Sequence, residues 1–240
     1  MPEDQKRKIM DKQVEEILKL LSLCTPDQRE IIYKELRKEF KIHPLENKLN
    51  ITAEIILEAI SKVESGLTLR MMRGVIAEAA FELEVITKLS NWSNITPEGD
   101  LSYDYLLSDE NGEVSVQVKL QRSKTLRPMQ ANEAYRKFSS NLFVVETQKT
   151  RGGTDAATKE NTRPYRFGEF DILAVSMQPS TNNWSDFMYT ISRWLIPQDD
   201  DKSKILKFQP VSPIVNDEWT SDFKTCVKWF RGDINKTISF

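Results

Sequence analysis

Residues that usually carry metal or redox chemistry are scarce in this chain. Among its 240 residues there are one histidine and two cysteines. Cys24 and Cys226 lie far apart in the sequence and show neither metal-ligand nor redox spacing, so we expect reduced thiols in an intracellular, cytoplasmic protein. His43 has no histidine or cysteine companion near it, and we assign it no role. A histidine-based metal site or catalytic triad is therefore not indicated.

Long apolar runs and a strong net charge are also missing. No stretch approaches the roughly 18 apolar residues that a membrane span requires, and the opening M-P-E-D-Q-K-R-K does not resemble a secretory signal. We therefore expect no membrane partner. The net charge is −2 and the pI is about 5.7, values that argue against a general nucleic-acid binder.

The charge is, however, unevenly distributed along the chain. Residues 119–166 contain five lysines and six arginines against four acidic residues, a net charge of +7, so the rest of the chain carries −9. Such a segment can be a solvated face and nothing more. In an otherwise acidic protein it also suits a cleft that follows phosphates, because low background charge limits non-specific binding.

Helical patterns dominate residues 1–66, which we expect to form a bundle-like region that serves DNA recognition, dimerisation or both. Apolar side chains recur at helical spacing through residues 9–21. The T-P-D-Q sequence at residues 25–28 combines a cap residue, a proline at the first helical position and a glutamine three places after the cap. This pattern predicts a helix to about Phe40. Thr52 is expected to cap a further helix.

Residues 67–240 are expected to form a second domain with an α/β fold, in which helices flank a central mixed β-sheet. The Asn111-Gly112 dipeptide predicts a hairpin between the first two strands. The mixed order of helices and strands favours the α/β class. Helices are expected at residues 69–89, 129–139 and 184–195, and strands at residues 101–108, 114–121, 141–147 and 170–177.

Four polar residues are expected to meet at one end of this sheet. Asp104 lies among apolar and aromatic residues in S-Y-D-Y-L-L, where a carboxylate is unfavourable unless it is paired, hydrogen-bonded or metal-bound. The hairpin directs it towards V-S-V-Q-V-K-L-Q, whose polar face carries Gln117 and Lys119. Glu78 lies near the apolar stripe of the preceding helix. Two carboxylates, an amide oxygen and the carbonyl of Val118 would form an oxygen-only site that suits Mg²⁺.

A lysine beside such a site can help to deprotonate a metal-bound water or can balance charge in the transition state, and Lys119 is placed for this. Each of these residues taken alone also fits an ordinary structural role. Glu82, one helical turn after Glu78, is an alternative acid. Asp171 is expected to be a structural residue at the end of a strand.

In order and spacing, these segments resemble the PD-(D/E)xK nuclease superfamily. The resemblance rests on G-V-I-A-E, Y-D-Y-L-L and V-Q-V-K-L-Q-R, and it covers roughly residues 70–175. Y-R-F-G-E-F-D-I-L-A-V is similar to a downstream strand of restriction endonucleases. The resemblance implies a restriction-endonuclease-like core in which Asp104 binds the metal, Lys119 is the catalytic lysine and Glu78 is the helix acid.

The sequence departs from the family pattern at two places. No proline precedes the aspartate of Y-D-Y-L-L, and Gln117 stands where a second acid is expected, a variant that also occurs in the superfamily. Glutamine offers only a neutral oxygen, so we expect a lower metal affinity unless Glu78 or Glu113 compensates. One metal ion or two are both compatible with this pattern.

The positively charged segment supplies the candidate DNA contacts. Residues that follow directly from the strand with Lys119 are expected to hold phosphates near the scissile bond: Gln121, Arg122, Ser123, Lys124 and Arg127. The polar loop around Gly152-Gly153 is expected to contact a groove, where arginine pairs with guanine and glutamine with adenine. Its candidates are Gln148, Lys149, Arg151, Gly152, Gly153, Thr154, Arg163, Tyr165 and Arg166. A plain flexible loop is the alternative interpretation.

The leading hypothesis is a Mg²⁺-dependent type II restriction endonuclease that cleaves double-stranded DNA at a specific sequence. Palindromic duplex sites favour two-fold symmetric proteins, so we expect a homodimer. Two alternatives stay open. One is a nuclease of the same chemistry that recognises DNA structure in repair or recombination, and the other is a non-catalytic DNA-binding protein that keeps the fold.

Overall fold

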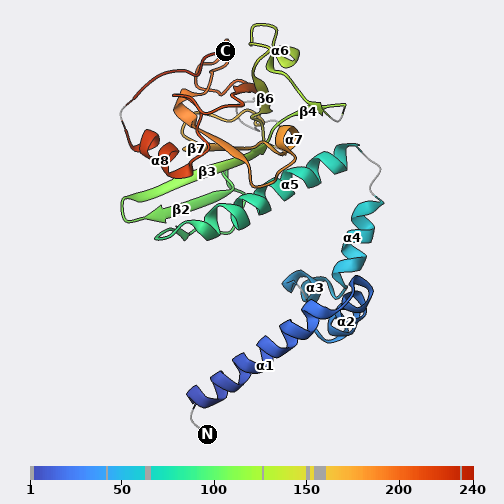
Figure 1. Cartoon of the computed structure of the whole chain (residues 1–240). Coiled ribbons are helices and arrows are strands. Elements are labelled where there is room, and N and C mark those ends of the chain that lie inside the picture. Colours follow the sequence, from blue (N-terminus) through green and yellow to red (C-terminus); the bar gives the residue numbers. More distant parts are fainter. Residues whose placement is uncertain are drawn as a thin grey trace. The chain divides into compact units, whose positions relative to one another are not determined.

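The computed structural model describes residues 3–41, 43–62, 66–125, 127–149, 152–153, 161–232 and 234–240. The chain divides into two compact units, residues 1–65 and residues 66–240 (Figure 1). No helix in the described ranges combines the length and the apolar character needed to cross a lipid bilayer.

The first unit consists of helices that bury little apolar surface. The expected capping box is present, because Thr25 Oγ1 accepts the N–H of Gln28 and Gln28 Oε1 accepts the N–H of Thr25. The expected apolar stripes are nevertheless largely exposed, with Ile17 at 56% and Leu57 at 64%. The described residues therefore do not form the apolar core of a bundle. The helices are α1 (Glu3–Leu23), α2 (Pro26–Glu39), α3 (Pro44–Leu49) and α4 (Ala53–Ser61).

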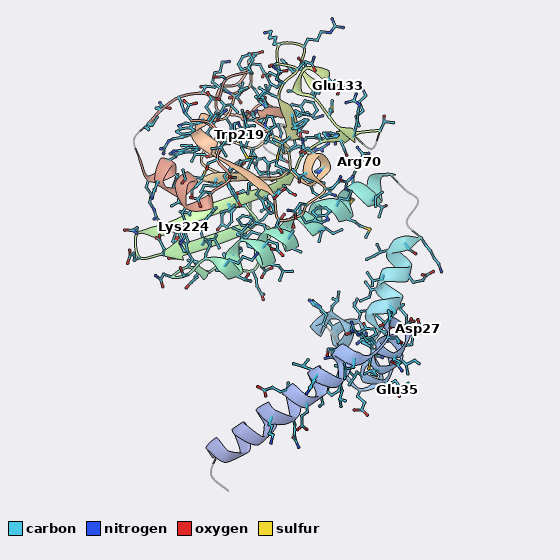
Figure 2. All side chains as sticks on the ribbon, viewed as in Figure 1. Asp27, Glu35, Arg70, Glu133, Trp219 and Lys224 are labelled. Atoms are coloured by element: carbon cyan, nitrogen blue, oxygen red, sulfur yellow. The ribbon has the colours of Figure 1, made fainter. Side chains whose placement is uncertain are left out.

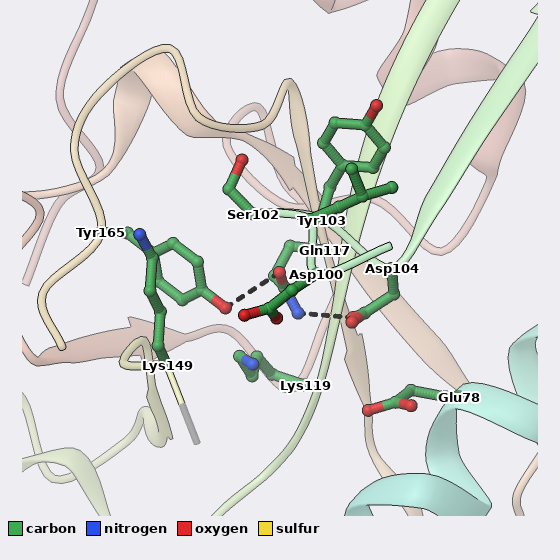
Figure 3. A pocket seen from close by; sticks show the side chains of 10 residues that line it. Glu78, Asp100, Ser102, Tyr103, Asp104, Gln117, Lys119, Lys149 and Tyr165 are labelled. Carbon is green, nitrogen blue, oxygen red and sulfur yellow. Dashed lines mark hydrogen bonds between the residues drawn. The ribbon is translucent and has the colours of Figure 1, made fainter. Parts of the chain in front are cut away.

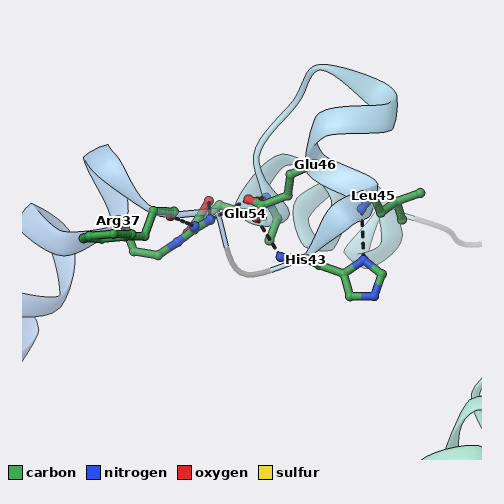
Figure 4. A network of polar contacts seen from close by, with 7 residues as sticks. Arg37, His43, Leu45, Glu46 and Glu54 are labelled. Carbon is green, nitrogen blue, oxygen red and sulfur yellow. Dashed lines mark hydrogen bonds and ion pairs between the residues drawn. The ribbon is translucent and has the colours of Figure 1, made fainter. Parts of the chain in front are cut away.

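A polar network joins α2, α3 and α4 in place of that core. Glu46 is the one buried side chain among those described in this unit, and its Oε1 accepts a hydrogen bond from Arg37 Nη2 at 2.7 Å. Glu46 also accepts the backbone N–H groups of His43 and Ala53, at 3.1 and 2.7 Å. Arg37 Nε donates to Glu54 at 3.0 Å (Figure 4). Charge-assisted hydrogen bonds therefore set how these three helices meet.

The second unit is an α/β fold built on a mixed sheet, as expected. Within the described residues this sheet has five strands in the order β1-β2-β3-β7-β8. β3 and β7 are parallel, with Gln117 opposite Leu173, and the other neighbours are antiparallel. The sheet strands are β1 (Ser93–Asn94), β2 (Tyr105–Asp109), β3 (Gly112–Leu120), β7 (Ile172–Ser176) and β8 (Phe187–Ile191). The other elements are α5 (Gly66–Glu84), η1 (Ile86–Lys88), β4 (Ser123–Lys124), β5 (Arg127–Pro128), α6 (Ala131–Ala134), β6 (Phe143–Glu146), α7 (Gln178–Thr181), η2 (Ser192–Trp194), β9 (Phe208–Val211) and α8 (Phe223–Arg231).

The β2–β3 hairpin turns at Asn111-Gly112, as the sequence predicts. Asp109 pairs with Gly112, whose φ of +117° is readily adopted by glycine and strained for other residues. β2 begins at Tyr105, four residues later than expected. The reason is that the carboxylate of Asp104, and not a backbone carbonyl, accepts the N–H of Val118 at 2.7 Å.

Helix α5 lies along the β2–β3 hairpin (Figure 1) and is fixed to the sheet by an aromatic cluster. Ala77 and Phe81 are fully buried on its inner face. The ring of Phe81 lies 5.5 Å from those of Tyr105 and Phe187, and 6.0 Å from that of Phe223 at the start of α8. Two strands and two helices therefore share one packing centre, which holds α5 against the hairpin.

The remaining strands pair in two further small sheets, β4 with β5 and β6 with β9, both antiparallel. Trp219 is 2% exposed and lies in the densely packed interior of this unit (Figure 2). The core of the second unit is thus apolar and aromatic.

Three expected helices differ from the structure. Residues 184–195 form β8 and η2, so the helix prediction is wrong there. All residues of β8 are buried, and F-M-Y-T-I has the aromatic and β-branched content that suits a strand covered on both faces. The helix at residues 129–139 shortens to α6, because the chain is extended at Tyr135 with φ −143°. The helix at residues 69–89 ends at Glu84.

Replacing Arg37 by alanine is expected to loosen α2, α3 and α4. The carboxylate of Glu46 would stay buried and lose its ion pair with Arg37, which is strongly unfavourable. We expect amide hydrogen exchange in residues 26–61 to accelerate by on the order of tenfold in the full chain, with residues 66–240 unchanged.

The matched control is Lys34→Ala, which removes only an exposed ion pair with Glu30. Its exchange should match that of the wild type, because exposed pairs contribute little. Undiminished protection of α2 to α4 in Arg37→Ala would contradict the structural role given to this network.

Candidate active site

Asp104 is positioned by the hairpin to which it belongs. Its Oδ2 accepts a hydrogen bond from the N–H of Val118 at 2.7 Å and another from Gln117 Nε2. Both partners lie on β3, and Asp104 directly precedes β2. The local turn at Asn111-Gly112 is therefore enough to bring this carboxylate to the polar side of the neighbouring strand.

Gln117 is buried beside it, at 2% exposure, and its amide is hydrogen-bonded at both ends. Nε2 donates to Asp104 Oδ2 and, at 3.3 Å, to the carbonyl oxygen of Val118. Oε1 accepts the hydroxyl of Tyr165 at 2.9 Å (Figure 3). The side chain of Gln117 thus faces the interior of the protein and not the solvent.

Two lysines flank the ring of Tyr165. The Nζ atoms of Lys119 and Lys149 each lie 5.4 Å from the ring centroid. Lys149 is also paired with Glu169, at 2.6 Å between Nζ and Oε1. Both lysines line the pocket that contains Asp104, so the site combines acidic oxygens with two ammonium groups.

Glu78 reaches the same place from α5. The hydroxyl of Tyr105 in β2 donates to the backbone carbonyl of Glu78 at 2.9 Å, which ties this helical turn to the hairpin. Glu78 lines the pocket, whereas Glu82 and Glu113 are exposed. Of the acids considered from the sequence, Glu78 is therefore the one that the fold brings to Asp104.

These side chains enclose a pocket of about 620 Å³. The carboxylates of Glu78 and Asp104 and the ammonium group of Lys119 point into the same space (Figure 3). Its walls come from α5, β3 and the segments that precede β2 and β7. The lining residues are Glu78, Asp100, Leu101, Ser102, Tyr103, Asp104, Gln117, Lys119, Lys149 and Tyr165.

Burial alters the proton affinities of these groups. Desolvation, followed by the nearby charge of Asp104, raises the pKa of Glu78 to about 7, although Lys119 opposes the shift. Desolvation also raises the pKa of Asp104, against the opposing effects of Lys119 and two hydrogen bonds. Desolvation lowers the pKa of Lys119, although Asp104 and Glu78 oppose it. Burial therefore disfavours the charged form of all three groups.

The oxygen donors fit a small, hard cation. Asp104 Oδ2 and the carbonyl oxygen of Val118 both contact the NH₂ group of Gln117, so they face one point in space. In the described part of the chain, no three His, Cys, Asp or Glu side chains converge closely enough to hold a metal ion. A cation here would depend on the carboxylates of Asp104 and Glu78 together with neutral amide and carbonyl oxygens. Such a set suits Mg²⁺ better than zinc.

The polar loop between β6 and β7 begins and ends at this pocket. Lys149 and Tyr165 both line the pocket wall. The N–H of Lys149 donates to the carbonyl of Arg163 at 2.9 Å, and farther out the N–H of Thr162 donates to the carbonyl of Gly153 at 3.0 Å. The described residues of this loop therefore form an antiparallel arm that starts at the site.

Close packing within the arm explains why position 152 is a glycine. A Cβ atom on Gly152 would lie 2.0 Å from Cγ of Arg163, so a side chain there would displace the arginine. Arg163 itself is exposed. Arg151 and Thr154, which are also predicted DNA contacts, lie outside the described residues.

Several predicted DNA contacts are already engaged within the chain. Gln148 forms a bridge to Pro164, and Ser123 pairs with Pro128 in the small β4–β5 sheet. A phosphate would have to compete with carboxylates for three of the cations. Their ion pairs are Arg122–Glu146, Lys124–Glu133 and Arg166–Asp201, at 3.2, 3.3 and 3.9 Å.

Two predicted DNA contacts are wrong, because both side chains are buried. Gln121 is 1% exposed, where the chain bridges to Val145 of β6. Tyr165 is 4% exposed, and its hydroxyl points inward to Gln117. Tyr165 belongs to the pocket and not to a DNA-facing surface.

The sequence gives little warning of the pairing between Lys149 and Glu169. Ser102 Oγ donates to the backbone carbonyl of Glu169 at 2.8 Å, which joins the segment before β2 to the segment before β7. Glu169 follows Gly168, whose φ is +88°, so F-G-E-F marks a turn.

Asp171 has the expected structural role at the end of a strand. Its Oδ2 accepts hydrogen bonds from the N–H and from the hydroxyl of Ser115, at 2.8 and 2.7 Å.

No protein-family model and no curated protein sequence matches this chain. Among solved structures, the chain is similar to the bacterial homing endonuclease I-Ssp6803I, with a TM-score of 0.35 and 22% sequence identity. The match covers 64% of this chain and 81% of the other. At this score and identity, the likeness does not carry an activity over to this chain.

Replacing Glu78 by glutamine is expected to stabilise the metal-free protein at high pH. Burial raises the pKa of Glu78 from its ordinary value of 4.5 to about 7 in the folded chain, so the folded state binds the proton more tightly. Its ionisation therefore disfavours folding increasingly as the pH rises from about 4.5 through 7. With EDTA present, the thermal midpoint of Glu78→Gln should exceed that of the wild type at about pH 8, and the difference should shrink towards zero at about pH 5.

Glu82→Gln provides the control, because Glu82 is exposed one turn farther along α5. Glu82→Gln changes only an exposed side chain, so its thermal midpoint should stay close to that of the wild type. A Glu78→Gln protein whose stability difference is the same at both pH values would show that Glu78 is not the titrating group.

Proposed function

We propose that this protein is a divalent-cation-dependent endonuclease that hydrolyses phosphodiester bonds of double-stranded DNA. The observation that carries the proposal is the convergence of Glu78, Asp104, Gln117 and Lys119 in one pocket. Acidic oxygens beside a half-buried lysine are suited to hydrolysis of a phosphate ester, where negative charge must be balanced and water must lose a proton.

In this proposal, Asp104, Glu78 and the carbonyl of Val118 hold Mg²⁺, with the amide oxygen of Gln117 as a neutral ligand. The cation, when bound, would polarise the phosphoryl group and make a bound water more acidic. Lys119, in its neutral form, orients the attacking water and receives its proton, and burial favours the neutral form because it lowers the lysine's pKa. Lys149 pairs with Glu169 and lies over the ring of Tyr165, and from there it offers a second positive charge to the phosphate.

The arm that leaves the pocket supports duplex DNA as the substrate. It carries exposed polar and basic groups, among them Arg163, and it starts beside Lys149. Side chains of this kind can read base edges in a groove, which favours a sequence-specific enzyme of the type II restriction class. Exposed apolar residues on α1 and α4 support a role of the first unit in homodimer formation.

A plasmid digest tests the proposed activity directly. Supercoiled plasmid is incubated with the protein and Mg²⁺, and a parallel sample contains EDTA. Discrete fragments that appear only with Mg²⁺ are expected for a sequence-specific nuclease. A smear would favour a nuclease without sequence preference, and intact plasmid that is bound but not cut would favour the non-catalytic DNA-binding alternative.

Asp104→Asn and Lys119→Met are each expected to reduce cleavage by at least about 10²-fold, because each removes a group that stabilises developing charge or positions the cation. Single-turnover cleavage of a labelled duplex provides the rate, and a gel-shift assay in Ca²⁺ reports binding. DNA binding should persist in both variants.

The control is Lys88→Ala, which removes an exposed lysine paired with Glu84 near the end of α5. It should cleave at the wild-type rate. If Asp104→Asn or Lys119→Met cleaved equally fast, the pocket could not be the catalytic site.

Arg163→Ala is expected to weaken DNA binding in a salt-dependent manner. If Arg163 contacts one phosphate, the slope of log affinity against log salt concentration should fall by about 0.9. Lys202→Ala, which removes an exposed lysine paired with Asp199, should leave the slope unchanged. Equal slopes for the wild type and Arg163→Ala would show that Arg163 does not contact a DNA phosphate.

A further inference from the structure

The side-chain amide of Gln117 lies where a cation's ligands converge. Its NH₂ group donates both to Asp104 Oδ2 and to the carbonyl oxygen of Val118. Its oxygen points the other way and accepts the hydroxyl of Tyr165 at 2.9 Å (Figure 3). The partly positive NH₂ group therefore stands at the point that two oxygen ligands face, and the amide oxygen is turned away from it.

A cation held by Asp104 and Val118 would meet this NH₂ group and not an oxygen. The amide has nearly equal shape at its two ends, so a half-turn about its last side-chain bond exchanges the oxygen and the nitrogen. After that turn the oxygen faces Asp104 and Val118, which is favourable only with a positive charge between them. The nitrogen then faces Tyr165.

The hydroxyl of Tyr165 can form a hydrogen bond with the amide of Gln117 in either orientation of that amide. A phenolic hydroxyl donates one hydrogen bond and also accepts, so it can donate to Oε1 of Gln117 or accept from Nε2. Gln117 and Tyr165 are 2% and 4% exposed, so bulk water has little access to replace either bond. A phenylalanine at position 165 could serve neither orientation.

We propose that Gln117 is a two-state ligand and that Tyr165 is the positioning residue that stabilises both states. In the cation-free site, the NH₂ group of Gln117 bridges Asp104 and Val118, and Tyr165 donates to the amide oxygen. Entry of a divalent cation turns the amide over, so that its oxygen faces the cation and Tyr165 accepts from its nitrogen. This inference rests on the proposed cation-dependent function and assigns it a switching element.

The same arrangement gives a reason for glutamine at position 117. A glutamate there would place a third carboxylate beside Asp104 and Glu78 and could not donate to Asp104 in the empty site. Glutamine supplies two donors when no cation is present and an oxygen when one arrives. The cation-free pocket is thereby satisfied without additional charge.

The first test measures Mg²⁺ binding without DNA, by calorimetry, for the wild type and Tyr165→Phe. In the variant, the cation-free site leaves a buried carbonyl without a donor, whereas the occupied site leaves a buried N–H without an acceptor. Buried N–H groups are tolerated less well than carbonyl groups. Mg²⁺ should therefore bind about three- to tenfold more weakly to Tyr165→Phe.

Tyr135→Phe is the matched control, because Tyr135 packs on Phe138 and does not line the pocket. It should bind Mg²⁺ with wild-type affinity. Equal affinity in Tyr165→Phe and wild type, or tighter binding in Tyr165→Phe, would overturn the inference and leave the nuclease proposal intact.

The second test follows the amide itself by NMR. The side-chain NH₂ resonances of Gln117 are assigned by their absence from the spectrum of Gln117→Glu. They should shift as Mg²⁺ saturates the site, with the dissociation constant that calorimetry gives. Resonances that do not move while Mg²⁺ binds would refute the turn of the amide.

Gln117→Glu also provides a test that does not depend on Tyr165→Phe being well folded. The added carboxylate should lower the thermal midpoint in EDTA, and Mg²⁺ should raise that midpoint by more than it raises the wild type's. A smaller Mg²⁺-induced rise than in the wild type would count against the proposal. Absence of Mg²⁺ binding to the wild-type chain would overturn both the inference and the cation-dependent function. The other contrary outcomes overturn the inference alone, so the two failures can be told apart.

Discussion

The carboxylate of Asp104 is the constraint on which the rest of the site depends. It is half-buried at the start of β2, and β3 satisfies it through the N–H of Val118 and the amide of Gln117. These bonds end the β2 ladder early and fix which way the amide of Gln117 points. The amide oxygen of Gln117 in turn accepts a hydrogen bond from the buried hydroxyl of Tyr165. One unfavourable acid therefore organises residues from three separate parts of the chain.

The parts of the site that the sequence predicts are those that local geometry determines. The Asn111-Gly112 turn sets the register of β2 against β3, and strand alternation then places Gln117 and Lys119 on one face. The sequence favours Glu78 but leaves Glu82 as an alternative, and the packing of Phe81, which sets the rotation of α5, decides which of the two lines the pocket. Register is a short-range property, whereas helix rotation depends on the whole core.

The burial of Tyr165 and Gln121 and the strand conformation of β8 could not be predicted from the sequence, and the reason is the same for all three. Tyr165 and Gln121 occur in a polar, basic stretch, and their burial arises from contacts with distant strands. The residues of β8 show a pattern that fits a helix as well as a strand, and only burial on both faces decides between them. The net positive charge of residues 119–166 is also partly balanced by acids from outside that segment, because Glu169 pairs with Lys149 and Asp201 with Arg166 in the fold.

The parallel pairing of β3 with β7 has a consequence for how the protein is made. About fifty residues separate the end of β3 from the start of β7, and Tyr165 lies in that interval. On the ribosome the β2–β3 hairpin emerges first, and it can close through local contacts alone, but long-range parallel pairing must await the later segment. A nascent chain that stops before Ile172 therefore contains Asp104, Gln117 and Lys119 without the strand that completes their surroundings. Translation thus delays assembly of a finished pocket until most of the polypeptide has been synthesised.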